Sequence, residues 1–125
     1  MVRRVNVSGY EAVKAAIDSE KNHSGPIFVL FTGSKNAKGE SWCPDCVKAE
    51  PFIEEVLHSN RSELLFIQCD VGNRNFWKDQ NNAFRKDNFL KLTGVPTLLK
   101  IKENKRLQEE QLFNKDLVAM LFEED

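Results

Sequence analysis

The chain has little of what several classes of protein require. Its longest apolar runs, near residues 27–31 and 64–67, are too short to span a bilayer. Its first residues carry arginine but no apolar segment typical of a secretory signal. The net charge of −1 offers no basic excess that would attract nucleic acid. We therefore expect no membrane association and no nucleic-acid partner.

Cysteine is also scarce. Three cysteines among 125 residues are an odd number and too few for a secreted domain stapled by disulfides. This indicates a reducing compartment, most simply a cytoplasmic location. Apolar residues make up 41% of the chain and charged residues 30%, which is the composition of an ordinary globular domain with one core. We expect residues 1–125 to form one domain, without repeats or linkers, and to be a monomer.

Hydrophobic periodicity predicts alternating strands and helices. Strands are expected around residues 5–7, at 26–31, 63–71 and 97–101, and from residue 106 onward; helices are expected at 10–21, 43–58 and 81–91 and after residue 114. The continuous apolar run at 26–31 is typical of a central strand covered on both faces. Ser8, with Glu11 three residues later, has the pattern of a capping box for the first helix. Asn114 is expected to cap the last helix, and residues 72–80 are expected to form a loop.

The motif Trp-Cys-Pro-Asp-Cys at residues 42–46 says most about function. Two cysteines separated by two residues, at the joint between a strand and a helix, are typical of a redox-active dithiol in an intracellular protein. One helical turn brings the two sulfurs within bonding reach. Cys43 falls at the start of the helix, where free backbone N–H groups and the helix dipole favour a thiolate. We therefore predict Cys43 as the exposed attacking cysteine and Cys46 as the more shielded resolving cysteine.

The two residues inside the motif tune the dithiol. Pro44 suits the first turn of a helix, where its missing N–H costs nothing. Asp45 places a carboxylate beside the thiolate, which opposes the helix dipole and keeps the pKa of Cys43 from falling far. A less stabilised thiolate makes the couple more reducing, which favours a reductase over an oxidase. Asp45 could equally serve as a partner for the N–H groups that begin the helix.

A metal site is the main chemical alternative for the two cysteines. Zinc needs four ligands, and the remaining candidates, Cys69, His23 and His58, are not at ligand spacing from one another. We therefore expect no metal. Cys69 lies within an apolar strand and is expected to be a buried, inert thiol.

A second motif, Gly-Val-Pro-Thr at residues 94–97, directly precedes the fourth expected strand. Together with the motif at 42–46 it makes the chain resemble the thioredoxin superfamily. Further stretches that resemble one branch of that superfamily are Phe-Thr-Gly-Ser-Lys at 31–35, Ala-Glu-Pro at 49–51, Phe-Trp-Lys-Asp at 76–79 and Val-Pro-Thr-Leu-Leu-Lys at 95–100. The resemblance covers essentially the whole chain. It implies an α/β thioredoxin fold: a central mixed five-stranded sheet flanked by helices on both faces.

The resemblance also implies how the site is used. Val95 and Pro96 would be joined by a cis peptide bond that faces the cysteines and would offer the Val95 backbone to an extended substrate; a trans proline at the start of an edge strand is the alternative. Trp42 would flank the sulfur as a contact surface, or else pack in the core. No cofactor would be bound. Electrons would come from NADPH through thioredoxin reductase, and the substrates would be disulfides of proteins or of small molecules such as cystine.

Two departures from ordinary thioredoxin stand out. The strand before the motif carries Leu30 where thioredoxin has a buried aspartate that helps to deprotonate the resolving cysteine. The loop at residues 33–41 is also longer. Charged residues of this region could form a rim that favours small or charged disulfides; they are Lys35, Lys38, Glu40 and Asp45. A passive solvated loop is the equally plain alternative.

Two other functions stay open at this point. A glutaredoxin-like protein would use the same dithiol but would be reduced again by glutathione. A redox-gated interaction module would dock a partner, and the cysteines would only control that docking. The leading interpretation is a disulfide reductase of the thioredoxin type.

Overall fold

The computed structural model describes residues 2–60 and 62–123. Five strands form one sheet: β1 (Val2–Ser8), β2 (Ile27–Thr32), β3 (Leu64–Asp70), β4 (Thr97–Lys100) and β5 (Lys105–Gln108). They lie in the order β1–β3–β2–β4–β5. β3 pairs in parallel with both β1 and β2, whereas β4 is antiparallel to β2 and β5 is antiparallel to β4. The sheet is therefore mixed, with β2 at its centre.

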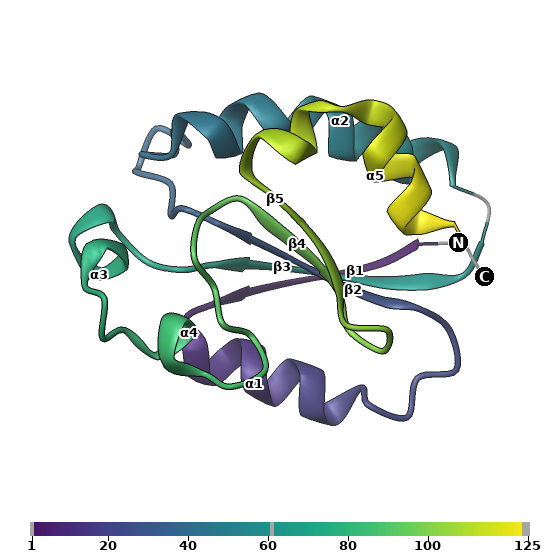
Figure 1. Cartoon of the computed structure of the whole chain (residues 1–125), viewed down its shortest axis with the longest axis horizontal. Helices are drawn as coiled ribbons and strands as arrows, with labels where there is room; N and C mark the ends of the chain where they lie inside the picture. The colour runs from purple at the N-terminus through teal and green to yellow at the C-terminus, as the bar shows by residue number, and fades with distance from the viewer. Residues whose placement is uncertain (1, 61, 124–125) are drawn as a thin grey trace.

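Helices cover both faces of this sheet (Figure 1). Their bounds are α1 (Tyr10–Ser19), α2 (Pro44–Ser59), α3 (Arg74–Lys78), α4 (Ala83–Lys86), the 3₁₀ helix η1 (Glu109–Phe113) and α5 (Lys115–Phe122). In Figure 1, α2 and α5 lie on one face and α1 on the other. This arrangement confirms the predicted thioredoxin fold. No described helix has the length and apolar character needed to cross a membrane.

The core forms where the sequence is most continuously apolar. Every residue of β2 from Ile27 to Phe31 is buried, as are residues 64–67 of β3, because helices cover the sheet on both sides. On the face below α2 and α5, the rings of Phe28 and Phe122 lie with their centroids 4.2 Å apart. Burial of apolar side chains on both faces fixes the two central strands, and with them the ends from which the functional loops leave.

The capping box predicted at the start of α1 is wrong. The N-cap of α1 is Gly9, with φ of 87°, and no side chain caps this end. The Ser8 hydroxyl instead donates a hydrogen bond to the Asp70 carboxylate across the β1–β3 pair. Ser8 is the last residue of β1, and its pairing with Asp70 decides where its side chain goes. By contrast, Asn114 does cap α5, since its side-chain oxygen accepts from the N–H groups of Asp116 and Leu117.

The stretch between β3 and β4 also differs from the prediction. Residues 74–78 form α3 where a loop was expected, and only residues 83–86 of the expected helix at 81–91 are helical, as α4. Both short helices begin at asparagines, Asn73 and Asn82, whose side chains accept a backbone N–H. The 3₁₀ helix η1 was not predicted. These elements are too short for a periodic pattern, so capping alone marks them.

Candidate active site

The register of the sheet brings four chain segments together at one end of the strands. β2 ends at Thr32 and leads toward the cysteines, while its antiparallel partner β4 begins at Thr97, which pairs with Phe31. β3 ends beside β2, so the chain toward α3 starts at the same end. β5 ends here as well, because Gln108 pairs with Thr97. The two motifs recognised in the sequence therefore meet in space, although about fifty residues separate them.

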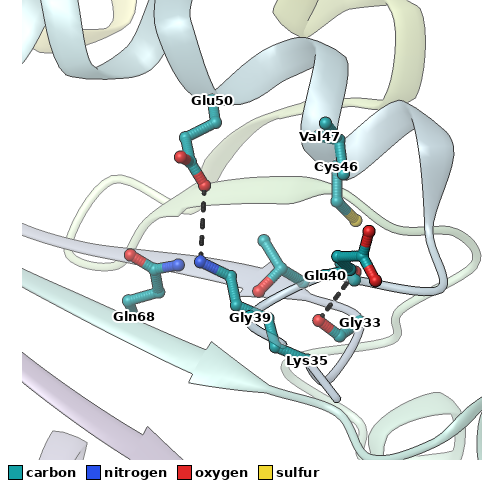
Figure 2. Close-up of a pocket in the computed structure, with 10 residues that line it drawn as sticks. Gly33, Lys35, Gly39, Glu40, Cys46, Val47, Glu50 and Gln68 are labelled. Carbon is teal, nitrogen blue, oxygen red and sulfur yellow. Dashed lines mark hydrogen bonds and ion pairs between the residues drawn. The ribbon is translucent and has the colours of Figure 1, made fainter. Parts of the chain in front are cut away.

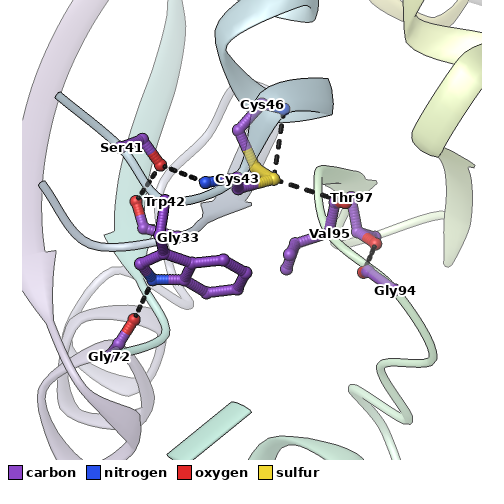
Figure 3. The surroundings of a disulfide bond; sticks show 9 residues. All are labelled: Gly33, Ser41, Trp42, Cys43, Cys46, Gly72, Gly94, Val95 and Thr97. Carbon is purple, nitrogen blue, oxygen red and sulfur yellow. Dashed lines mark hydrogen bonds between the residues drawn. A yellow bond between two sulfur atoms is a disulfide. The ribbon is translucent and has the colours of Figure 1, made fainter. Parts of the chain in front are cut away.

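Cys43 is the N-cap residue of α2, and Pro44 follows as the first helical residue. The backbone N–H of Cys46 donates to Cys43 Sγ at 3.1 Å, and the N–H of Cys43 donates to Ser41 Oγ at 3.1 Å (Figure 3). The two cysteines form a disulfide, with Cα atoms 5.2 Å apart. After reduction, a thiolate on Cys43 would sit where a helix start offers an N–H donor and positive potential, which favours the charged form.

The expected difference in exposure between the two cysteines is not observed. Cys43 is 4% exposed and Cys46 is 5% exposed in the oxidised pair. The two sulfurs are bonded to each other at the start of α2, and the segment at residues 94–97 packs beside them. Both cysteines are therefore buried to the same extent. What separates the two sulfurs is the side on which each meets open space.

Val95 and Pro96 are joined by a cis peptide bond, as the resemblance implied. The Val95 carbonyl oxygen lies 3.7 Å from Cys43 Sγ. Thr97 Oγ1 donates to the Gly94 carbonyl at 2.7 Å, which ties the turn to the start of β4 (Figure 3). The Val95 backbone is therefore placed directly beside the sulfur that we expect to react.

Trp42 combines the two roles that the sequence left open. Its indole N–H donates to the Gly72 carbonyl at 2.9 Å, and its ring packs on Gly33, where an added Cβ would lie 2.6 Å from Trp42 Cε2. The side chain is half-buried and also lines the cavity at Cys43. Packing thus holds the ring at the edge of the site, and only part of it can touch a substrate.

Two cavities flank the disulfide. A cavity of about 400 Å³, called here the Cys43 cavity, is lined by Trp42, Cys43, Pro44, Asp45, Arg74, Trp77, Thr93, Gly94, Val95 and Glu109. A second cavity of about 380 Å³, the Cys46 cavity, is lined by Thr32, Gly33, Lys35, Gly39, Glu40, Ser41, Cys46, Val47, Glu50 and Gln68 (Figure 2). Each of the two cysteines therefore lines a cavity of its own.

The long loop at residues 33–41 walls the Cys46 cavity. It is organised by Asn36, whose side-chain oxygen accepts the N–H groups of Lys38 and Glu40 at 2.8 and 3.0 Å. Lys35 reaches α2 through an ion pair of 3.8 Å with Glu50. Of the charged rim expected from the sequence, only Asp45 lines the Cys43 cavity. The loop residues Lys35 and Glu40 line the other side instead.

Sequence reasoning missed Arg74 and Glu109 as residues of the site, and it used Trp77 only as part of the family resemblance. Trp77 is 7% exposed and is held by the Arg85 guanidinium, 4.0 Å above its ring, yet it lines the Cys43 cavity. Its neighbour Phe76 is 45% exposed. The asparagine cap at Asn73 was a signal for α3, but nothing local in the sequence marks Glu109.

Cys69, the third cysteine, lies in β3 and is fully buried. Burial raises the pKa of its thiol to about 12, and the neighbouring Asp70 carboxylate adds to the effect. Cys69 therefore stays protonated at neutral pH, which agrees with the expected inert thiol.

Leu30 lies in β2 and is buried, with 4% exposure. Among the described residues, the buried polar side chains are Asn82, Thr97 and Lys100, so no aspartate or glutamate is buried there. The residues that the structure describes also contain no group of three or more histidine, cysteine, aspartate or glutamate side chains that could hold a metal ion.

A thioredoxin fold with a cysteine pair at the start of α2, facing a cis-proline turn, defines a protein of the thioredoxin class. Comparison with known proteins narrows this. Residues 6–124 match the family described as "Thioredoxin domain-containing protein 17-like, thioredoxin domain", and the chain belongs to this family.

Several relatives are similar over most of their length. The chain is 49% identical to thioredoxin domain-containing protein 17 of Homo sapiens over 121 residues, which cover 97% of this chain and 95% of the relative. The protein of the same name in Danio rerio gives the same identity and coverage. The thioredoxin-like protein Clot of Arabidopsis thaliana is 37% identical over 97 residues, covering 76% of this chain and 72% of the relative. The cysteine pair in a family of this kind indicates a redox role.

Proposed function

We propose that this protein is a thiol–disulfide oxidoreductase that reduces disulfides with the dithiol of Cys43 and Cys46. The observation that carries the proposal is the position of Cys43 Sγ. It receives the Cys46 N–H at the start of α2, lies 3.7 Å from the Val95 carbonyl oxygen and belongs to a residue that lines an open cavity. A helix start favours the thiolate, and the cavity gives it access to a substrate.

The reaction begins at Cys43. Its thiolate attacks one sulfur of the substrate disulfide, so that a new bond forms between that sulfur and Cys43 Sγ while the substrate bond breaks. The departing thiolate takes a proton from water. An extended substrate can lie along the backbone of Val95, which places its sulfur in front of Cys43.

Cys46 completes the reaction. Its thiol loses a proton, and its thiolate attacks Cys43 Sγ, which forms the protein disulfide and releases the second substrate thiolate. Two electrons have then passed from the protein dithiol to the substrate. Because Leu30 supplies no carboxylate, water in the Cys46 cavity is the proton acceptor that we propose, beside Glu40 and Glu50.

The oxidised protein must be reduced again. We propose that electrons come from NADPH through thioredoxin reductase, in the cytoplasm, and that this protein itself binds no cofactor. Protein disulfides and small disulfides such as cystine are the proposed substrate classes. Mixing the oxidised protein with thioredoxin reductase and NADPH, or with glutathione and glutathione reductase, distinguishes this route from a glutaredoxin-like one.

A trapping experiment tests the proposal. In Cys46→Ser, the mixed disulfide on Cys43 cannot be resolved, so substrates should remain attached to it. We expect adducts that are released by a reducing agent and are absent from the double variant Cys43→Ser/Cys46→Ser. No adduct with any disulfide, from a folded Cys46→Ser protein, would contradict the proposal.

A further inference from the structure

Glu109 has an unusual backbone conformation at the edge of the candidate site. It is the first residue of η1, directly after β5, and its φ is 53°, in the left-handed region that side chains other than glycine rarely adopt. Its N–H donates to the Pro96 carbonyl at 2.7 Å. Gln108 and Gln111 hold the next turn through a reciprocal capping box. The surrounding structure thus determines this conformation, as is common at functional sites.

The conformation places the Glu109 carboxylate against Gly94. A Cβ added to Gly94 would lie 2.0 Å from Glu109 Oε1, so the side chain occupies space that only a glycine leaves open. Gly94 directly precedes Val95, whose carbonyl oxygen faces Cys43 Sγ. The carboxylate therefore lies next to the turn along which a substrate would bind.

The Glu109 carboxylate forms no ion pair with any residue in the described part of the chain. The same holds for the Arg74 guanidinium, which also lines the Cys43 cavity. Asp45 is the third charged residue there. Two carboxylates and one guanidinium give the cavity a net negative charge, and an unpaired charge at its edge can interact with a charge on the substrate.

We propose that Glu109 is a specificity-determining residue that favours disulfides carrying positive charge beside the sulfur, and that Arg74 weakens this preference. The proposal rests on the proposed reduction of disulfides at Cys43. It places charge selection in the Cys43 cavity, in contrast to the long loop that the sequence suggested. The atoms and electrons of the reaction are unchanged, because Glu109 acts only on the approach and position of the substrate.

Three small disulfides of similar size test the proposal: cystamine with two ammonium groups, bis(2-hydroxyethyl) disulfide with no charge, and 3,3′-dithiodipropionate with two carboxylates. Pre-reduced protein is mixed with each of them, and the second-order rate constant of protein oxidation is measured by quenching with a maleimide. For each disulfide, the rate of a variant is divided by the rate of the unchanged protein. The intrinsic reactivity of the disulfide then cancels.

For Glu109→Gln, we expect the rate with cystamine to fall about two- to fivefold, the scale of one solvent-exposed charge interaction. The rate with the neutral disulfide should stay within the error, and the rate with the dicarboxylate should rise. For Arg74→Gln, we expect the rate with cystamine to rise and the rate with the dicarboxylate to fall. High salt should reduce all these differences.

Glu110→Gln is the matched control, because it removes the same charge from the adjacent exposed residue, which does not line the cavity. Equal factors for all three disulfides in Glu109→Gln, or equal effects of Glu109→Gln and Glu110→Gln, would overturn the proposal while leaving disulfide reduction intact. No oxidation of the unchanged protein by any of the three disulfides would instead contradict the proposed function.

Discussion

Cys43 and Cys69 are the same type of residue in two contrasting surroundings, one in a disulfide and one a free thiol. Both are almost inaccessible, at 4% and 0% exposure. The thiol of Cys69 lies within the sheet, where burial and the nearby Asp70 raise its pKa to about 12. Cys43 lies at the start of a helix, receives a backbone N–H at 3.1 Å and borders a cavity of about 400 Å³. Exposure alone does not separate them; the groups around each sulfur do.

The difference follows from the place of each residue in the fold. Cys69 lies in the middle of the sheet, paired with Phe31 and Val7, and its side chain belongs to the buried apolar cluster on one face, which leaves no room for a reactant. Cys43 follows β2 at the end of the strands where four chain segments meet. A helix that starts at such an end presents N–H donors and open space together, which is the combination that a thiolate needs.

The largest expected effect is the loss of activity when Cys43 is replaced by serine, compared with the same replacement at Cys69. Cys43→Ser should reduce disulfide reduction by about 10³-fold or more, the scale expected when a nucleophile is lost, with little change in the stability of the reduced protein. Cys69→Ser should leave the rate within about twofold but should lower the free energy of unfolding by about 1–3 kcal/mol, because a hydroxyl is buried in its place. Rates and urea unfolding under reducing conditions measure both. Similar activity losses in the two variants would break the contrast.

Gly33→Ala tests how packing holds the Cys43 side of the site. The added Cβ would lie 2.6 Å from Trp42 Cε2 and 3.0 Å from Cys43 Cβ. We expect the indole to move, its hydrogen bond to Gly72 to be lost and the free energy of unfolding to fall by about 1–3 kcal/mol. Tryptophan fluorescence and urea unfolding check this, with Gly39→Ala as a loop glycine whose added Cβ would meet nothing within 4 Å. Gly39 has a φ of 79°, so Gly39→Ala reports on backbone strain alone.

The raised pKa of Cys69 predicts a dependence of stability on pH. Well below pH 9, the ordinary pKa of a free thiol, Cys69 is protonated in both the folded and the unfolded chain. Between pH 9 and about 12, only the unfolded chain loses the proton, so stability falls as pH rises. In a Cys43→Ser/Cys46→Ser background, the advantage of Cys69 over Cys69→Ala should shrink by about 1–2 kcal/mol between about pH 8 and 10.5. An advantage that stays constant with pH would show that Cys69 titrates normally.

Asp45→Asn has the smallest expected effect. It removes a negative charge from the Cys43 cavity beside the start of α2, so the Cys43 thiolate should form at lower pH and the couple should become more oxidising by about 5–20 mV. Thiolate absorbance and equilibration with a glutathione buffer measure the two quantities. An unchanged potential would mean that Asp45 serves only as a partner for the first N–H groups of the helix.

The parts of the site that the sequence predicted are those with local signals. The spacing of Cys43 and Cys46, the proline after Val95 and the buried run of β2 each specify their own surroundings. Their meeting also follows, once the antiparallel pairing of β2 with β4 is known, because the chain leaves one strand where it enters the other.

The rest depends on contacts between distant segments. Ser8 has the pattern of a helix cap, but its neighbour across the sheet, Asp70, takes its hydroxyl. Glu109 lies at the site because Gln108 pairs with Thr97 at the end of β5, and no residue near Glu109 in the sequence indicates its left-handed backbone. The loop at 33–41 lines the Cys46 cavity, and its placement depends on contacts such as the ion pair of Lys35 with Glu50 on α2.

Competitive alkylation of the reduced protein tests the central claim most directly. With a thiol pKa of about 12, only about one Cys69 in 10⁵ is a thiolate at pH 7. A limiting amount of iodoacetamide at pH 7, followed by peptide mass spectrometry, should therefore label Cys43 first and Cys69 only after unfolding in urea. Cys46 should be labelled more slowly than Cys43. Labelling of Cys69 at a rate similar to that of Cys43 in the folded protein would contradict the account.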